Sequence, residues 1–465
     1  MQIIQPQHII DREKLSPFQW MVFAFGFLVF FCDGLDTGII GFIAPQLIED
    51  WGVSKPALAP VMSAALVGMC LGALFSGPLA DKFGRKGLIV TTCILFSVFT
   101  ILCGFASTTH ELMLYRFITG LGLGAAMPNI STLVSEYMPI KRKAFLTGLA
   151  GCGFMLGISF GGVLSAYLLD HFGWEIVIMI GGIIPLVLTV ILFMKLPESV
   201  QYLVKINQLE RACVILSQIE GKLLNSTVKL SSGESQTEII ENPVKVLWAG
   251  YRWNSIFLWA CCFTSLLVFY LLTSWMPTIL KTAGLSTQQF SLITAIFPFG
   301  GVIGAIIMGW YMDKVNPTKV VKYSYLFAVL FFLIAGLVYS NVLLLGITIF
   351  LIGALLVGAQ SSLLPLAAIT YPTSCRAVGV SWMHGIGRTG AILGAFYGSL
   401  IFSYELGLAQ IFFILAIPAA ISFFALLAKV IYENHQATLN VEPITQLETS
   451  KLDCSQYPRH ETASF

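Results

Sequence analysis

Two aspartates lie inside an apolar stretch near the start of the chain. Asp33 and Asp36 fall within a run from about residue 18 to 43, which is long enough to cross a bilayer because about 20 helical residues span its hydrocarbon core. A charged side chain at the bilayer centre costs about 2.5–3.5 kcal/mol on insertion scales. Since residues three apart share one helical face, we expect both carboxylates to face a protein interior in which protons and solutes move.

Two arginines lie deep enough in other apolar runs to meet these carboxylates. Arg116 precedes three glycines, and because an arginine inside a span needs a partner, we expect it to pair with Asp33 or Asp36. That pair could be a fixed structural contact or a part of proton coupling. Arg388 follows Arg376 by twelve residues, about 18 Å along a helix, which places it near the bilayer midplane. A guanidinium there suits a bidentate carboxylate, although a static ion pair is the alternative.

Other side chains in the apolar runs could contact a solute. Aromatic residues could face a ring, amides could hydrogen-bond its substituents, and a histidine one turn from Arg388 could relay a proton. Each of these residues could equally be an ordinary packing residue. Besides Arg388, the candidates for substrate contact are Asn129, Tyr270, Trp275, Gln360, Trp382 and His384.

The composition is that of a membrane protein. Of the 465 residues, 57% are hydrophobic and 11% are charged, whereas a soluble domain is about 25% charged. The net charge of +2 gives no reason to expect a nucleic-acid partner. The cysteines have no metal-ligand spacing, and the apolar runs contain no HExxH, Ser/His or metal-spaced cluster. We therefore predict a polytopic membrane protein that is not an enzyme and uses no metal or cofactor.

Twelve apolar runs divide into six and six. A polar linker over about 197–250 separates the group within 18–196 from the group within 251–432. Residues 1–17 lack a signal-peptide pattern, and residues 433–465 form a polar tail that we expect to be disordered. The twelve runs are 18–43, 57–80, 87–107, 111–135, 144–169, 174–196, 254–280, 288–312, 320–340, 342–370, 377–402 and 407–432.

The basic residues of the short loops predict the orientation. Ten of them fall on one side, whereas only Lys55 and Lys281 fall on the other. The positive-inside rule therefore places both termini and the linker in the cytoplasm. Within the linker, the apolar spacing over 206–219 predicts a helix that lies on the bundle, with a regulatory partner site as the alternative. The ten are Lys82, Arg85, Lys86, Lys141, Arg142, Lys143, Lys314, Lys319, Lys322 and Arg376.

The two halves of the chain repeat weakly. Residues 77–82 correspond to 309–314 at an offset of 232 residues, and the glycines of 157–161 correspond to those of 390–394 at an offset of 233. Such repeats are typical of secondary transporters, whose substrate site lies at mid-membrane between the halves. We therefore predict an all-α polytopic membrane protein with twelve transmembrane helices in two pseudo-symmetric six-helix bundles.

The loop after the second run is Gly77-Pro78-Leu79-Ala80-Asp81-Lys82-Phe83-Gly84-Arg85-Lys86, which resembles the loop signature of the major facilitator superfamily. Its glycines permit tight turns, and its charges could make and break contacts as the halves rock. Asn316-Pro317 stands where the second half would carry Gly-Arg, so we expect that half to hold its loop more loosely. The residues expected to act in conformational gating are Gly77, Asp81, Gly84, Arg85, Glu136, Arg142, Asp313 and Arg376.

Further motifs together resemble the aromatic acid:proton symporter family of that superfamily. They are Asp33-Gly34-x-Asp36-Thr37, Arg116 with its glycines, Ala126-Met127-Pro128-Asn129 before Ser135-Glu136-Tyr137, and Gly387-Arg388-x-Gly390. Pro197-Glu198-Ser199 resembles a signature that the superfamily shares with sugar transporters. The resemblance implies the major facilitator fold and functional roles for Asp33, Asp36, Arg116, Glu136, Asp313, Arg376 and Arg388.

The resemblance also implies proton-coupled uptake of a benzoate, 4-hydroxybenzoate or protocatechuate type of acid by alternating access, in a bacterial inner membrane and by a monomer. Arg388 would hold the carboxylate while Asp33, Asp36 and Arg116 couple the proton, with Asp36 favoured as the titrating acid. One proton per monoanion is electroneutral, whereas a second adds about 2.3 kcal/mol per 100 mV, and the motifs allow either. The alternatives are a carrier of muconate, of a dicarboxylate or of a sugar, an efflux carrier, and a membrane receptor for aromatic acids.

Overall fold

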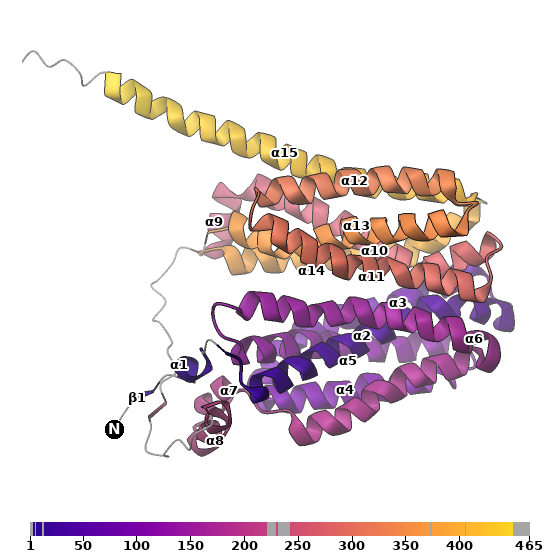
Figure 1. The fold of residues 1–465 in the computed structure, drawn as a ribbon, viewed down its shortest axis with the longest axis horizontal. Helices are drawn as coiled ribbons and strands as arrows, with labels where there is room; N and C mark the ends of the chain where they lie inside the picture. Colours follow the sequence, from indigo (N-terminus) through magenta and orange to yellow (C-terminus); the bar gives the residue numbers. More distant parts are fainter. Residues whose placement is uncertain are drawn as a thin grey trace, which may run out of the picture.

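Long helices, gathered in two halves that lie side by side, make up the protein in a computed structural model (Figure 1). The structure describes residues 3–4, 6–11, 14–220, 229–230, 242–372, 374–404 and 406–449. The first half contains α2 (Pro17–Trp51), α3 (Ala59–Phe83), α4 (Arg85–Cys103), α5 (Thr109–Tyr137) and α6 (Lys143–Lys195). The second half contains α10 (Arg252–Thr282), α11 (Thr287–Met312), α12 (Pro317–Val338), α13 (Val342–Thr370), α14 (Arg376–Tyr397) and α15 (Leu408–Thr449).

The number of spans follows from these helices. Within the described residues, ten helices are long and apolar enough to cross a membrane. One of them, α6, contains two spans, because its helical geometry is interrupted at Gly173, whose φ of 79° is positive. The remaining segment, α14, is less apolar because it carries His384 and Arg388 among its glycines. The two halves therefore hold six spans each, which confirms the prediction of twelve helices in two six-helix bundles.

Glycines bring the helices of each half into backbone contact. A Cβ at Gly157 of α6 would lie 1.9 Å from the carbonyl oxygen of Phe31 in α2. At the repeated position in the second half, a Cβ at Gly390 of α14 would lie 2.3 Å from the carbonyl oxygen of Phe263 in α10. The same close approach therefore recurs in both halves, as the internal repeat predicts.

Short elements gather at one end of the bundles, which we call the basic end because it carries the ten basic loop residues (Figure 1). The predicted linker helix corresponds to α8, whose apolar side chains Ala212, Cys213, Leu216 and Ile219 are buried against neighbours that include α2. The short elements are β1 (Ile3–Ile4), α1 (Pro6–Ile10), α7 (Val200–Lys205), α8 (Leu209–Glu220), β2 (Lys229–Leu230) and α9 (Pro243–Gly250), with β1 and β2 paired in parallel.

The last helix leaves the bundle at the basic end. It continues as helix through Thr449, beyond Tyr432 where the polar tail was expected to begin (Figure 1). Residues 450–465 lie outside the described residues. The expected disorder of the tail therefore stays a prediction.

Candidate functional site

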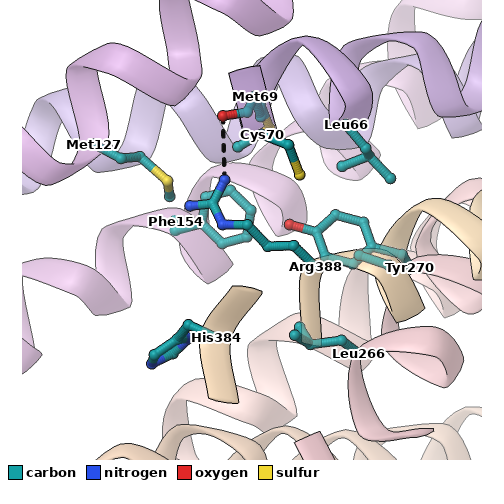
Figure 2. Close-up of a pocket in the computed structure, with 10 residues that line it drawn as sticks. Leu66, Met69, Cys70, Met127, Phe154, Leu266, Tyr270, His384 and Arg388 are labelled. Carbon is teal, nitrogen blue, oxygen red and sulfur yellow. Dashed lines mark hydrogen bonds between the residues drawn. The ribbon is translucent and has the colours of Figure 1, made fainter. Parts of the chain in front are cut away.

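A cavity of about 150 Å³ lies between the two halves (Figure 2). The first half contributes α3, α5 and α6, and the second contributes α10 and α14. Three of the predicted substrate-contacting residues line it, namely Tyr270, His384 and Arg388. Its other lining residues are Leu66, Met69, Cys70, Met127, Phe154, Leu266 and Ala391.

Arg388 is the charged residue of this cavity. Its side chain extends from α14 across to the first half, where Nη1 donates to the carbonyl oxygen of Met69 at 3.4 Å (Figure 2). Within the described part of the chain it forms no ion pair, although it lies within electrostatic reach of Asp33. Because a guanidinium has five N–H donors, most of its capacity stays available for an anion.

Asp36 and Arg116 form a buried ion pair inside the first half. Their side chains are 0% and 1% exposed, and Arg116 Nη1 lies 2.9 Å from Asp36 Oδ2. Arg116 Nη2 also donates to the backbone carbonyl of Asp36 at 3.3 Å, and the Thr100 hydroxyl donates to the other carboxylate oxygen. Both oxygens of Asp36 therefore have fixed partners within one bundle.

Asp33 has a different environment from Asp36, one turn away on the same helix. Its side chain is buried, and its only hydrogen bond in the described residues is a long one, 3.4 Å, from the Thr37 hydroxyl to Oδ1. Oδ2 is buried and has no hydrogen-bond partner among the residues that the structure describes. A buried carboxylate without a compensating partner is costly, which makes Asp33 the acid of this motif that gains most from taking up a proton.

Four predicted substrate contacts lie outside the residues that line the cavity. Trp275 is fully buried, and its indole N–H donates to the carbonyl of Ala395 at 2.7 Å. Trp382 is 39% exposed and packs against Trp259 with a ring separation of 5.8 Å. Asn129 donates to Ala125 of its own helix at 2.7 Å. Gln360 has a buried side-chain oxygen that finds no partner within the described ranges.

The predicted loop signature forms a cluster at the basic end of the first half. The Arg85 guanidinium pairs with Glu136, which also accepts a hydrogen bond of 2.5 Å from the Ser199 hydroxyl. The carboxylate of Glu198 accepts from the backbone N–H of Arg85 at 2.9 Å, at the start of α4. Gly84 has a φ of 83°, and a Cβ there would lie 2.4 Å from Glu198 Oε2. We call Arg85, Glu136, Glu198 and Ser199 the loop cluster.

The other predicted gating residues lie outside this cluster. Asp81 pairs with Lys205 at 3.4 Å, with both side chains more than half exposed. Gly77, Arg142 and Asp313 are exposed. Arg376 donates from Nε to the carbonyl of Tyr371 at 3.3 Å and forms no ion pair within the described ranges. Among the described residues, Asp313 forms no ion pair, whereas Arg85 and Asp81 of the first half each form one; the expectation that the second half holds its loop more loosely stays a prediction.

Polar contacts join the halves at the end opposite the basic end. Lys281 of α10 lies 2.7 Å from Glu49 of α2. Lys55, in the 3-10 helix η1 (Lys55–Leu58), donates to the Thr282 hydroxyl at 3.2 Å and lies 4.4 Å from the centre of the Phe402 ring. Phe402 belongs to η2 (Gly398–Tyr404). Together these contacts close the molecule at that end.

Several site residues were missed by the sequence reasoning. Thr100 has no motif around it, and its role depends on the tertiary placement of α4, from which its hydroxyl reaches Asp36 of α2. Phe154 is one of two phenylalanines in a glycine-rich run, which gives no sign of which ring faces a cavity. Glu198 and Ser199 did fall within a recognised signature, Pro197-Glu198-Ser199, but their partners in α4 and α5 did not follow from it.

Comparison with known proteins adds relatives and solved structures. The model of the Major Facilitator Superfamily matches residues 26–381 and 258–455. The chain is 44% identical to the 4-hydroxybenzoate transporter PcaK of Pseudomonas aeruginosa, over 91% of this chain and 95% of that protein. It is 39% identical to the gallate transporter of Pseudomonas putida, over 90% of this chain and 94% of the relative.

A more distant relative and a solved structure complete the comparison. The benzoate transport protein of Acinetobacter baylyi is 33% identical over 96% of both chains. The inward open structure of the xylose transporter XylE from E. coli has a TM-score of 0.67 at 18% identity, over 88% of this chain and 95% of that one. This structural likeness confirms the predicted major facilitator fold.

Proposed function

This chain belongs to the Major Facilitator Superfamily, whose members are transporters, and we propose that it takes up an aromatic carboxylate together with protons by alternating access. The observation that carries the proposal is Arg388, a guanidinium without an ion-pair partner in the described residues, in a cavity between the two halves. Binding of the anion and movement of the two halves would then both involve the Arg388 side chain.

The size and lining of the cavity support a single aromatic ring as cargo. A cavity of about 150 Å³ in another protein holds one benzene molecule, and the cavity here has the same volume. Its walls are mostly apolar, apart from Arg388, the Tyr270 hydroxyl, the Cys70 thiol and His384. The relatives named for 4-hydroxybenzoate, gallate and benzoate support the same class of cargo.

Asp33 is the proposed proton site. Asp36 is held by Arg116 and Thr100 inside the first half, so it is better placed as a structural anchor than as a group that exchanges protons. Asp33 has a buried oxygen without a partner in the described part of the chain, and it lies within electrostatic reach of Arg388. Protonation of Asp33 would leave Arg388 free for the substrate carboxylate, which links proton and anion in one step.

The contacts between Glu49 and Lys281 and around Lys55 support alternating access. They join the halves at the end opposite the basic end, whereas the loop cluster lies within the first half and the start of the linker. Opening toward that opposite end requires these contacts to break. The basic loops support cytoplasmic termini, and the bacterial relatives support an inner-membrane location.

An uptake panel in proteoliposomes with an imposed pH gradient tests the proposal. Radiolabelled 4-hydroxybenzoate, benzoate and gallate are expected to accumulate, whereas cis,cis-muconate, succinate and xylose are expected to enter no faster than in protein-free vesicles. Accumulation of muconate or succinate instead would assign the protein to another organic anion. Substrate-driven export with no proton-driven uptake would make it an efflux carrier.

A further inference from the structure

We propose that Phe154 is the residue that distinguishes aromatic from non-aromatic acids, and that Gly34 positions it. This inference rests on the proposed transport of an aromatic carboxylate and extends it to the side chain that selects the ring. Neither residue carries a charge or a hydrogen-bonding group on its side chain, so each would act through packing alone.

Phe154 is placed to meet the ring of a bound acid. It is the aromatic side chain that the first half contributes to the described cavity lining, and it is 7% exposed. Figure 2 shows its ring in the same cavity as the Arg388 guanidinium and the Tyr270 ring. An acid whose carboxylate is bound by Arg388, from the second half, therefore brings its ring within reach of Phe154, from the first.

An aromatic wall discriminates between rings in a way that an aliphatic wall does not. Offset or edge-to-face contacts between aromatic rings are favourable beyond the apolar area that they bury. A saturated ring of similar volume gains the burial but not this extra term. The remaining first-half lining residues, Leu66, Met69, Cys70 and Met127, carry no ring, so Phe154 is the side chain there that supplies such a contact.

Gly34 fixes the backbone from which the Phe154 ring projects. A Cβ at Gly34 would lie 1.8 Å from the carbonyl oxygen of Phe154 and 2.9 Å from its Cα. The contact is reciprocal, since a Cβ at Gly153 would lie 2.5 Å from the carbonyl oxygen of Phe27 in α2. Because backbone atoms cannot yield as a flexible side chain does, any larger residue at position 34 displaces α6 at Phe154.

The position of Gly34 also joins two functions on one turn of helix. It lies between Asp33, the proposed proton site, and Asp36, the anchored acid. The Asp36 carboxylate faces Arg116 of α5, while Gly34 lets α2 pack closely against α6, the helix that carries Phe154. The glycine of this motif is thus a positioning residue, which acts on the substrate through Phe154.

Competition by matched inhibitors tests the role of Phe154. In proteoliposomes that take up labelled 4-hydroxybenzoate, benzoate is expected to inhibit the wild-type protein at a lower concentration than cyclohexanecarboxylate. Phe154→Leu is expected to raise the inhibition constant of benzoate by about 3- to 10-fold, the range of an aromatic contact, and to leave that of cyclohexanecarboxylate nearly unchanged. Phe154→Tyr keeps a ring and is expected to keep the preference.

Matched controls separate this effect from a general disturbance of α6. Phe160, on the same helix but 41% exposed, serves as the control, and Phe160→Leu is expected to leave both inhibition constants unchanged. Gly34→Ala is expected to reduce the benzoate preference as Phe154→Leu does, with no further loss in the double variant. Gly151→Ala is its control, because a Cβ at Gly151 meets no atom within 4 Å.

The outcomes distinguish this inference from the proposed function. A Phe154→Leu protein that still transports 4-hydroxybenzoate with an unchanged ratio of the two inhibition constants overturns the role of Phe154 and leaves aromatic acid transport intact. A wild-type protein that takes up no aromatic acid overturns the proposed function itself. If Gly34→Ala fails to fold, the Phe154 variants still decide whether Phe154 selects aromatic acids. A Gly34→Ala protein that folds and keeps the wild-type preference for benzoate overturns the positioning role of Gly34.

Discussion

The two halves share their backbone packing but differ in where they place charge. The close helix contact at Gly157 recurs at Gly390, and the contact of Gly120 with Ala65 recurs between Gly353 and Phe297. These pairs fix the correspondence at 232 residues for α2 and α3 and at 233 for α5 and α6. The duplicated framework is therefore common to both halves. The side chains that differ at corresponding positions indicate how the charged groups are divided between the halves.

The buried ion pair belongs to the first half alone among these corresponding positions. Asp36 corresponds to Val268 and Arg116 to Ile349, both of which are fully buried. The same interior site thus holds two charges in one half and two aliphatic side chains in the other. Since well-packed apolar residues often replace a buried ion pair without loss of stability, the duplicated framework itself does not require charged side chains at this site.

The proton and anion sites show the same contrast. Asp33 corresponds to Ser265, which accepts a hydrogen bond of 3.0 Å from the Tyr325 hydroxyl. Arg388 corresponds to Met155 in the first half. Each half therefore contributes one charged side chain where the other has a neutral one, a buried carboxylate in the first half and a cavity-lining guanidinium in the second.

The largest expected effect follows from breaking the buried ion pair. Arg116→Ile leaves Asp36 as an uncompensated buried charge and is expected to lower the free energy of unfolding by about 3–5 kcal/mol. Adding Asp36→Val reproduces the pair of the second half and is expected to restore most of that loss. Thermal unfolding in detergent measures both, and a double variant no more stable than Arg116→Ile alone would contradict the correspondence of the halves.

Arg388→Met gives the second half the methionine that the first half carries at the corresponding position. Losing one partner of a buried charged contact costs about 2–5 kcal/mol, so the affinity for 4-hydroxybenzoate is expected to fall by at least about 30-fold, as measured by equilibrium binding to purified protein. Arg376→Met, at the exposed basic end of the same helix, is the control. Wild-type affinity in Arg388→Met would remove the carboxylate-binding role of Arg388.

A smaller difference is expected between the loops at the basic end. Arg85→Ala leaves the nearly buried Glu136 without its ion-pair partner and is expected to cost about 1–3 kcal/mol of stability. Asp313→Asn, in the second half, is expected to change stability by less than about 0.5 kcal/mol, as is usual for exposed positions. The two unfolding midpoints decide this, and equal effects would mean that the halves hold their loops alike.

The smallest effect concerns the contacts that join the halves. Glu49 is 62% exposed, and exposed ion pairs contribute about 0.2–1 kcal/mol, so Glu49→Gln is expected to change the uptake rate by no more than about fivefold. The neighbouring Asp50, also exposed, supplies Asp50→Asn as the control. Glu49→Lys is expected to slow uptake further, and adding Lys281→Glu to restore it. Failure of this charge exchange to restore the rate would exclude the pair from gating.

The repeat and the charge pattern of the sequence predict much of the fold. Hydropathy finds the spans because a bilayer permits only helices or closed barrels to cross it. The cost of a buried charge predicts that Arg116 pairs with Asp33 or Asp36, but both acids share one face of α2, so the choice depends on how α5 packs against it. The structure pairs Arg116 with Asp36, which turns attention from the acid favoured by the sequence to Asp33.

The aromatic part of the site could not be predicted in the same way. Tyr270 lines the cavity while Trp275, one and a half turns further along the same helix, donates its N–H to Ala395. Both are large aromatic residues in an apolar span, so composition does not separate them. Phe154 was not singled out because its placement depends on the fit of Gly34 against its backbone, a contact between helices far apart in the sequence.

The proposal that Asp33 binds the proton while Arg388 binds the substrate carboxylate is tested most directly by substrate transport in proteoliposomes that contain the Asp33→Asn variant. We predict that this variant exchanges labelled 4-hydroxybenzoate against internal unlabelled substrate but no longer accumulates it when an inward proton gradient is imposed, while the wild-type protein does both. Asp33→Asn vesicles that still accumulate the acid in response to the proton gradient would contradict the assignment of the proton to Asp33.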